Sequence, residues 1–515
     1  MELNVVIILG LLVAITSCLE KPNIVILFAD DLGWGDLGCY GHPTSTSPNL
    51  DKMAAEGLKF MNFYSTSPIC SPSRASLLTG RYQVRTGMYP GALECGSIGG
   101  LPWNETTIAA QLKQAGYGTA IVGKWHLGVG REQQYLPTNY GFDYFLGLPY
   151  SHDMCPCYVC FYPQEACYDD CRPESTPCPL YENDKIIQQP ADFLKLSETY
   201  SSAATGFIHQ MAAKKKPFFL YMAFQHTHHP QFSSKMFTNS SIRGTFGDSL
   251  NEMDWQVGKI FDAIHGAGIA KNTFVFFTSD NGPSLFRGVR GGSAGPFRCG
   301  KGTTYEGGVR MPAIAWWPGR IAPGVTSELT ATLDLFPTIS NLVNIAVPTD
   351  RVIDGIDMST VLFANTEGGR ESLMYYPPNP TPSQGVFAIR YKEYKAHYYT
   401  AGTGLYPKYY PDPACNYTKN ATHYDPPLLF NLNQDPGELN PLNTSGFPYK
   451  EIVDTINQIK IKFEAAVTWA EPEISKGVSN DSKPCAKPGC TPFPQCCTTN
   501  DIVPGTTRII HPGLL

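Results

Sequence analysis

The stretch NIVILFADD, from Asn23 to Asp31, joins an unbroken apolar run to two adjacent carboxylates. Apolar runs of this length are typical of strands that are buried on both faces of a parallel sheet. Three later runs have the same character, namely TAIVG (Thr119–Gly123), PFFLYMAF (Pro217–Phe224) and TFVFFTS (Thr273–Ser279). Helical patterns lie between them, over Thr106–Gly116 and Ser249–Gly268. This alternation predicts an α/β fold with a large, mixed but mainly parallel sheet flanked by helices.

Polar residues follow each of the four apolar runs. In chain order they are Asp30 and Asp31; Lys124 and His126; His226, His228 and His229; and Asp280 and Asn281. Each group has a simpler interpretation on its own, as a helix cap, a turn or surface decoration. Ligands of open α/β sheets bind at the carboxyl ends of the strands, so polar residues at four such ends favour one shared site.

The side-chain types indicate what this site binds. Carboxylate and amide oxygens from Asp30, Asp31, Asp280 and Asn281 are hard ligands that suit calcium or magnesium rather than zinc or copper. Positive charge is added by a second set, Arg74, Lys124, His126, His228 and Lys301. A metal ion surrounded by cations is suited to a tetrahedral oxyanion. The pattern therefore predicts a metal-assisted ester hydrolase, without choosing between phosphate and sulfate.

The stretch PICSPSRASLLTGR, from Pro68 to Arg81, makes that choice by resemblance. It resembles the sulfatase signature, in which the cysteine is oxidised in the endoplasmic reticulum to Cα-formylglycine. The likeness extends over nearly the whole chain and includes GKWHLGVG and RCGKGTTYEGGVR. It is strongest to the arylsulfatase A group, and the galactosamine-6-sulfatase group is the nearest competitor. The loop Ala401–Cys415 matches poorly until its final DPAC.

The resemblance implies an alkaline-phosphatase-like sulfatase fold and a set of site residues. One divalent cation, calcium with magnesium as the alternative, is expected at Asp30, Asp31, Cys70, Asp280 and Asn281. The catalytic residues are expected to be Cys70, as formylglycine, with Arg74, Lys124, His126, His228 and Lys301. The expected substrate-binding residues are Lys124, Ser151, His228 and Lys301. His226 and His229 are then neighbours of the site.

The same resemblance implies a function and its partners. We expect hydrolysis of sulfate esters, with galactosyl-3-sulfate lipids as the substrate, a formylglycine-generating enzyme as a biosynthetic partner, and a homo-oligomer. Three alternatives stay open: a galactosamine-6-sulfatase acting on sulfated glycosaminoglycans, a phosphate esterase on the same scaffold, and a catalytically silent protein that binds sulfated glycans. The last is disfavoured because every expected site position is filled.

The texture of the chain changes after about residue 340. The alternating, aromatic-rich stretch Gly385–Tyr399 predicts two antiparallel strands, and Pro426–Leu439 a strand followed by a turn. Tyr449–Ala470 predicts an amphipathic helix. We therefore expect a catalytic domain over residues 19–340 and a smaller C-terminal α+β domain with an antiparallel sheet and a cysteine-rich tail over 341–515.

The N-terminus and the cysteines indicate export. The apolar run Val5–Ile15 has the length of a signal peptide, which we place at residues 1–18. Of 16 cysteines, Cys18 leaves with this segment and Cys70 is set aside, which leaves an even number for pairing. The clusters Cys155–Cys178 and Cys485–Cys497 contain no histidine, which favours disulfides over zinc.

Composition excludes one class of partner and predicts a compartment. A net charge of −6, without a basic patch interleaved with aromatics, argues against nucleic acid. Six sequons are candidates for glycosylation, at Asn104, Asn239, Asn416, Asn420, Asn443 and Asn480. With the family resemblance, they predict a lysosomal enzyme that passes through the secretory pathway, with secretion as the alternative.

Overall fold

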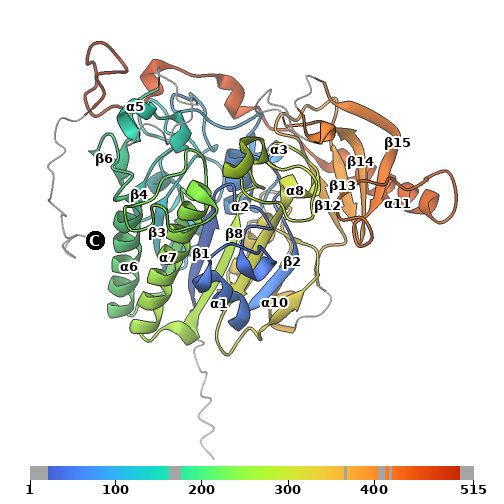
Figure 1. Cartoon of the computed structure of the whole chain (residues 1–515), viewed down its shortest axis with the longest axis horizontal. Coiled ribbons are helices and arrows are strands. Elements are labelled where there is room, and N and C mark those ends of the chain that lie inside the picture. The colour runs from blue at the N-terminus through green and yellow to red at the C-terminus, as the bar shows by residue number, and fades with distance from the viewer. Residues whose placement is uncertain (1–20, 162–174, 365–367, 404–411, 417–419, 499–515) are drawn as a thin grey trace, which may run out of the picture.

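The computed structural model describes residues 21–161, 175–364, 368–403, 412–416 and 420–498 (Figure 1). The predicted signal peptide lies outside the described residues. In the described part, the larger of two sheets has 11 strands. Its main path runs β10 (Gly324–Thr326), β2 (Leu58–Tyr64), β9 (Arg310–Trp316), β8 (Thr273–Ser279), β1 (Asn23–Ala29), β7 (Phe218–Ala223), β3 (Gly118–Gly123), β4 (Tyr144–Gly147), β5 (Leu180–Glu182) and β6 (Lys185–Gln188), and β11 (Thr330–Ala331) also pairs with β2.

The four strands predicted from apolar runs form the centre of this sheet. They lie side by side in the order β8, β1, β7, β3 and are all parallel. Every residue of these strands is buried, which is why they read as continuous apolar runs rather than alternating ones. Antiparallel strands lie beyond them, at β9 on one side and at β5 and β6 on the other. The prediction of a mixed, mainly parallel sheet is confirmed.

Helices pack against the two sheets and against one another. They are α1 (Pro48–Glu56), α2 (Cys70–Thr79), α3 (Gln83–Thr86), α4 (Ile108–Gln114), α5 (Cys157–Cys160), α6 (Leu196–Ala213), α7 (Gly244–Gly266), α8 (Glu306–Val309), α9 (Leu335–Leu342), α10 (Ser359–Ala364) and α11 (Tyr449–Ala466). The long helices α6 and α7 pack together in front of the sheet in Figure 1, whereas α2, α4 and α9 form a second packed group. Within the described ranges, we find no helix that combines the length and apolarity needed to span a bilayer.

The smaller sheet lies in the C-terminal part of the chain. Its antiparallel strands follow the order β12 (Ser372–Tyr375), β13 (Ala388–Tyr391), β14 (Tyr394–Thr400) and β15 (Thr422–Asn431). Helix α11 packs on β13 and β15. The predicted antiparallel pair, the strand before the turn and the amphipathic helix are therefore confirmed. The domain boundary near residue 340 stays a prediction.

The last described residues return to the larger sheet's half of the molecule. Ser97 and Val478 form an isolated β-bridge, and Ser479 N donates to Gly96 O. Further along, Ala486 N donates to the side chain of Gln189. The cysteine-rich tail therefore packs away from the antiparallel sheet that precedes it in sequence.

The cysteines form disulfides at some positions and remain free thiols at others. Disulfides join Cys155 to Cys178, Cys299 to Cys415, Cys485 to Cys497 and Cys490 to Cys496, in agreement with the choice of disulfides over zinc. The even number that suggests pairing is misleading, because Cys39, Cys95 and Cys160 are free thiols. Parity counts cysteines but carries no geometry, and a disulfide needs two Cα atoms within about 7 Å.

Candidate active site

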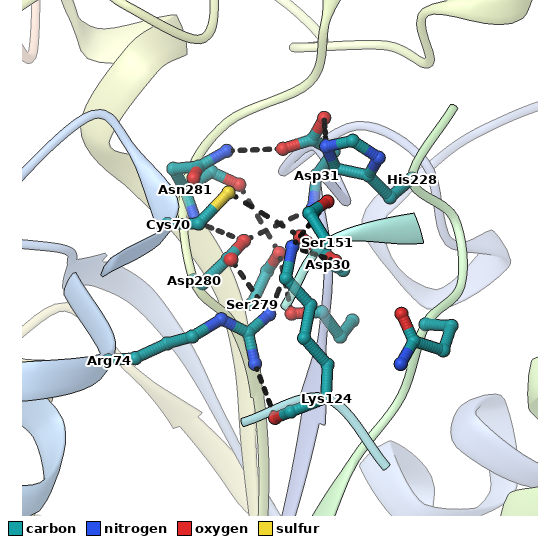
Figure 2. Close-up of polar contacts among 12 residues, drawn as sticks. Asp30, Asp31, Cys70, Arg74, Lys124, Ser151, His228, Ser279, Asp280 and Asn281 are labelled. Atoms are coloured by element: carbon teal, nitrogen blue, oxygen red, sulfur yellow. Dashed lines mark hydrogen bonds and ion pairs between the residues drawn. The ribbon is translucent and has the colours of Figure 1, made fainter. Parts of the chain in front are cut away.

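The carboxyl ends of β8, β1, β7 and β3 bring the predicted site residues together (Figure 2). We call this group the strand-end cluster, and all its members are buried: Asp30, Asp31, Cys70, Arg74, Lys124, His228, Asp280, Asn281 and Lys301. Backbone bonds tie the strand ends to one another. Asp30 N donates to His226 O at 2.8 Å, and Asp280 N donates to Ala29 O at 3.2 Å. The predicted convergence of four strand ends is therefore observed.

The backbone turns sharply where the chain leaves the strands. Gly123 ends β3 with φ +114°, and a Cβ there would lie 1.8 Å from Ala223 O, so only glycine fits. Asp31 and His126 adopt the left-handed region, with φ of +57° and +59°. Residues other than glycine take up this region rarely, and they do so preferentially at functional sites. These turns aim side chains from separate strands into one space.

Cys70 is the first residue of α2, which also carries Arg74. Pro72 is tolerated because it lies in the first helical turn, and Gly80 ends the helix with φ +68°. The Cys70 Sγ lies 3.5 Å from Lys301 Nζ and 3.8 Å from Asp30 Oδ1. Burial raises the pKa of this thiol, which keeps it protonated.

Asp30 and Asp31 are ionised carboxylates surrounded by cations. Lys124 Nζ lies 2.6 Å from Asp30 Oδ2, and Lys301 Nζ lies 2.6 Å from Asp31 Oδ1. Burial alone would raise both pKa values, but the cations outweigh it. Lys124 is the strongest of them at Asp30, whose pKa falls well below its ordinary value, and Lys301 is the strongest at Asp31, whose pKa is also lowered.

Asp280 is the carboxyl group of the cluster whose negative charge is least favoured. Its Oδ2 accepts from Arg74 Nη2 at 2.8 Å, and its Oδ1 accepts from the backbone N–H groups of Asp31 and Asn281. Burial first, and then repulsion by Asp30, raise its pKa to about 7 despite the neighbouring guanidinium. Three carboxylates in one dry space thus repel each other, and an added cation would relieve this repulsion.

The donor set fits a hard divalent cation. One potential ligand atom from each of Asp30, Asp31, Cys70 and His228 lies within 4.8 Å of the others. Asn281 Oδ1 is buried and has no hydrogen-bond partner among the described residues, although its amide nitrogen donates to Asp31 Oδ1 at 2.7 Å. An unsatisfied carbonyl oxygen beside three carboxylates is the environment that calcium or magnesium requires.

Lys301 and His228 face each other across Asp31. Lys301 Nζ lies 3.2 Å from His228 Nε2, which in turn lies 3.6 Å from Asp31 Oδ2. His228 Nδ1 donates to the His229 carbonyl, so the nitrogen facing the cluster is Nε2. Burial would lower the pKa of Lys301, but Asp31 raises it well above its ordinary value. Burial and then Lys301 lower the pKa of His228.

The remaining predicted residues line the same space. Lys124 Nζ donates to Ser151 Oγ at 3.1 Å as well as to Asp30. His126 Nε2 bonds Leu93 O at 2.8 Å, and its Nδ1 is buried without a partner among the described residues. Burial, followed by the charge of Lys124, holds the pKa of His126 well below its ordinary value. His126 is therefore a neutral ring with one free nitrogen, so the prediction that it adds positive charge is wrong.

Two histidines and the sequons lie outside the cluster. His226 Nε2 bonds Glu252 Oε2 at 2.9 Å, and His229 contributes its backbone carbonyl to His228. Both are neighbours of the site, as expected from the resemblance. Asn416 is half-buried, and the other five sequon asparagines are exposed, namely Asn104, Asn239, Asn420, Asn443 and Asn480; their glycosylation stays a prediction.

Sequence reasoning missed two serines that support the cluster. Ser284 Oγ donates to Asp31 Oδ2 at 2.7 Å, and Ser73 Oγ donates to the Asp280 carbonyl at 2.6 Å. Ser73 lies within the Cys70 motif, whereas Ser284 comes three residues after Asn281. Nothing in the residue type distinguishes them there, because serine is common in turns and helix starts.

The fold and the cluster together define a hydrolase of oxyanion esters with an alkaline-phosphatase-like architecture. The sequence matches the family model described as sulfatase over residues 22–345, and that of the C-terminal region of aryl-sulfatase over residues 368–498. The chain belongs to the sulfatase family. It is therefore an enzyme that hydrolyses sulfate esters, as the resemblance of the Cys70 motif predicted.

Relatives of known identity cover nearly the whole chain. Arylsulfatase A of Homo sapiens is 47% identical, over 94% of this chain and 96% of that protein. The N-acetylgalactosamine-6-sulfatase of Mus musculus is 39% identical, over 96% of each. Among solved structures, the PsFucS1 sulfatase from Pseudoalteromonas sp. has a TM-score of 0.73 and 29% identity, and covers 87% of this chain and 92% of that chain.

Proposed function

We propose that this sulfatase uses Cys70, converted to Cα-formylglycine, as its nucleophilic residue, and one divalent cation held by Asp30, Asp31, Asp280 and Asn281. The observation that carries the proposal is the place of the Cys70 thiol. It is unpaired and buried, 3.5 Å from Lys301 Nζ and 3.8 Å from Asp30 Oδ1. A structural cysteine gains nothing from such a charged position.

The protonation state of the thiol argues against an unmodified nucleophile. Burial raises the pKa of Cys70, so the thiolate required for attack is scarce. A hydrated aldehyde at this position supplies a hydroxyl for in-line attack on sulfur, and its second hydroxyl allows the bound sulfate to leave. Sulfate esters are poor targets for direct attack by water, and the second hydroxyl makes such an attack unnecessary.

The cation supplies Lewis-acid chemistry when bound, since it polarises oxygen atoms and lowers their pKa. Calcium is the expected ion and magnesium the alternative, because the donors are carboxylates and an amide oxygen. Arg74 holds two of these carboxylates in place, because its Nη2 lies 2.8 Å from Asp280 Oδ2 and 3.4 Å from Asp30 Oδ1. The neutral His126 presents Nδ1 to orient the hydrated aldehyde.

Two lysines and Ser151 bind the sulfate group. Lys124 Nζ and Lys301 Nζ neutralise its oxygens, and Ser151 Oγ lies within 3.1 Å of Lys124 Nζ. Both lysines are buried, at 0% and 7% exposure, so their charges act in a medium that screens them weakly. Negative charge that develops on the leaving oxygen is stabilised at the same place.

His228 is the proton donor to the leaving group. Its Nδ1 is committed to the His229 carbonyl, and therefore the proton moves at Nε2, which faces the cluster. Lys301 keeps its own proton because Asp31 raises its pKa. Because the pKa of His228 is lowered, Nε2 is protonated only in acid, which supports an acidic working pH.

The decisive experiment is mass spectrometry of the peptide that contains residue 70, on active protein from a eukaryotic secretory host. We expect the mass of the aldehyde, and Cys70→Ser is expected to be folded and inactive on sulfate esters. Cys95→Ser is the matched control, since Cys95 is a second buried free thiol outside the cluster. A free or disulfide-bonded Cys70 in fully active enzyme would reject the proposal.

For the natural substrate, we propose galactosyl-3-sulfate lipids, in line with the greater identity to arylsulfatase A than to the N-acetylgalactosamine-6-sulfatase. The second candidate is a galactosamine-6-sulfate ester of a glycosaminoglycan, favoured by the 39% identity over 96% of both chains. Hydrolysis of sulfatide is to be compared with that of a galactosamine-6-sulfate oligosaccharide. Preference for the oligosaccharide would favour the second candidate, and turnover of phosphate esters alone would reject both.

The cellular setting belongs to the same proposal. Exposed sequons and disulfides support passage through the secretory pathway to the lysosome, with secretion as the alternative. A formylglycine-generating enzyme is the required partner on that route. A homo-oligomer stays a prediction from the resemblance. Colocalisation of the glycosylated protein with lysosomal markers is the test of its destination.

A further inference from the structure

The loop that carries Lys301 is held from both sides. On the side of the catalytic cysteine, Gly302 N donates to Pro68 O at 2.9 Å. On the side of the C-terminal sheet, a disulfide joins Cys299 to Cys415. Arg298, one residue earlier, pairs with Asp412 and donates from Nη1 to Glu438 O at 3.0 Å. Lys301 thus lies between two anchors, of which one belongs to the C-terminal part.

A buried group of polar side chains extends this second anchor. We call it the inter-sheet cluster, because it joins β2 and β9 of the larger sheet to β13 and β14 of the smaller one: Tyr64, Glu306, Arg310, Arg390, Lys395, His397 and Glu438. Glu306 opens α8, directly after the Lys301 loop. Its Oε2 accepts from Tyr64 Oη at 2.6 Å, and its Oε1 accepts from Lys395 Nζ at 2.9 Å.

Glu438 is the member of the cluster that bonds directly to the end of the Lys301 loop. Its Oε2 accepts from the backbone N–H of Glu306 at 2.6 Å. Its Oε1 accepts from His397 Nε2 at 2.6 Å and lies 3.2 Å from Lys395 Nζ. Glu438, Lys395 and His397 are fully buried, so these contacts are not weakened by water. The His397 ring also packs on Tyr305, with ring centroids 5.0 Å apart.

The C-terminal part also reaches Lys301 itself. A small pocket beside its side chain is lined by Leu285 and Phe286 and, from the C-terminal part, by Thr403 and Cys415. Lys301 Nζ must keep three distances at once, to Asp31, His228 and Cys70. A displacement of about 1 Å at such a site is enough to cost up to 10²-fold in rate.

We propose that Glu438 is a positioning residue for Lys301, and that through it the C-terminal sheet completes the active site. The inference rests on the role proposed above for Lys301. Glu438 fixes the start of α8, and the disulfide at Cys299 fixes the other end of the loop, so the loop between them holds Lys301 Nζ against Cys70. The smaller sheet is then part of the catalytic apparatus rather than an appended module.

A double-mutant cycle separates positioning from mere stability. Glu438→Gln is made in the wild type and in Lys301→Ala, and kcat/KM is measured on a small aryl sulfate together with the thermal midpoint. We expect Glu438→Gln to lower kcat/KM about 10- to 100-fold in the wild type but less than about 3-fold in Lys301→Ala. The thermal midpoint should fall equally in both backgrounds. Lys450→Ala, an exposed change on α11, is the control and should alter neither quantity.

Each other outcome overturns the proposal in a recognisable way. Equal losses of kcat/KM in both backgrounds, or folded Glu438→Gln with normal kcat/KM, reject positioning while the role of Lys301 stands. Wild-type activity of Lys301→Ala rejects that role and the positioning proposal together. If Glu438→Gln is not recovered folded, His397→Phe takes its place in the cycle, because it keeps the ring contact with Tyr305 and removes only the bond to Glu438.

Discussion

Two buried groups of charges lie among the described residues, and they differ in how well their surroundings stabilise a charged carboxylate. In the strand-end cluster, Asp280 has its pKa raised to about 7, and Asn281 Oδ1 has no partner among the described residues. In the inter-sheet cluster, both Glu306 oxygens are bonded. Burial alone would raise the pKa of Glu306, but Lys395 first, then Arg310 and Arg390, lower it to about 2.

This difference separates a ligand-binding site from a structural cluster that holds the two sheets together. In the inter-sheet cluster the carboxylates of Glu306 and Glu438 are outnumbered by three cations, Arg310, Arg390 and Lys395, and their contacts hold two sheets together. A cluster that keeps crowded carboxylates and an unbonded oxygen pays for that arrangement unless a ligand is bound. Removing charge should therefore abolish activity at the strand ends while sparing stability. Between the sheets, the same change should lower stability strongly.

The largest expected effect is that of Asp280→Asn. The neutral amide removes one of three mutually repelling carboxylates and one proposed cation ligand, so activity should fall about 10³-fold or more. The free energy of unfolding of chelator-treated protein should stay equal or rise. Steady-state kinetics and chemical denaturation measure the two quantities on the same preparation.

A matched control is available in Asp254, whose pKa burial likewise raises, to about 6. Its carboxylate accepts from the backbone N–H groups of Asn49 and Leu50 at the start of α1, outside the strand-end cluster. Asp254→Asn should keep activity. Comparable losses for both variants would mean that the strand-end cluster is no more sensitive than any buried aspartate.

The second prediction concerns Glu306→Gln in the inter-sheet cluster. The change leaves Lys395 and Arg310 buried with one carboxylate fewer, and breaking such a pair costs about 3–5 kcal/mol. The free energy of unfolding from denaturant titration should fall by that amount. Glu328→Gln is the control, since Glu328 is half-buried and its carboxylate accepts one backbone bond, from Gly369 N. If Glu306→Gln lowers the free energy of unfolding by less than 1 kcal/mol, the structural role assigned to this cluster is contradicted.

The strand-end cluster was largely predictable from sequence, and the reason is local. An apolar run that ends in Asp-Asp or Asp-Asn shows both the buried strand and the polar end within ten residues. Parallel neighbours then bring the ends together without further information. The Cys70 motif is also contiguous, so its resemblance to the sulfatase signature needed no structure.

The inter-sheet cluster was not predictable, because its partners are far apart in sequence. Glu306 meets Lys395 across 89 positions and Glu438 across 132. Charged residues are usually solvated, and nothing adjacent in the sequence shows that these are buried. The free thiols Cys39, Cys95 and Cys160 could not be identified from sequence for a related reason, since pairing depends on distances that an even count does not contain.

A third prediction uses pH to isolate Glu306. Its pKa is about 2 in the folded protein against an ordinary value of 4.5, so its contribution is complete above pH 4.5 and is lost as pH falls toward 2. The difference in free energy of unfolding between wild type and Glu306→Gln should therefore be flat from pH 7 to 5. It should then shrink by about 3 kcal/mol toward pH 2.

Other titrating groups cancel in this difference, apart from those that contact Glu306. His397 is the one to watch, because burial lowers its pKa and its neutral form is favoured on folding. Its effect on stability therefore begins as pH falls below about 6.5, well above the window of Glu306. A difference that already declines between pH 7 and 5 would show that His397 and Glu306 are coupled, against the interpretation of a separable carboxylate.

The smallest expected effect belongs to an ion pair that neither cluster contains. Lys450 Nζ lies 2.7 Å from Asp454 Oδ2 on α11, closer than several buried pairs, but both side chains are more than half exposed. Water screens the attraction and the two flexible chains lose entropy on pairing. Lys450→Ala should therefore shift the thermal midpoint by less than about 1 °C and leave kcat/KM unchanged.

The measurement is a thermal unfolding scan at low salt and at about 0.5 M salt. Any shift should disappear at the higher salt concentration, because the Debye length shortens. A larger shift that survives salt would mean that distance alone decides the value of an ion pair, and the contrast between the two buried clusters would then lose its basis in burial.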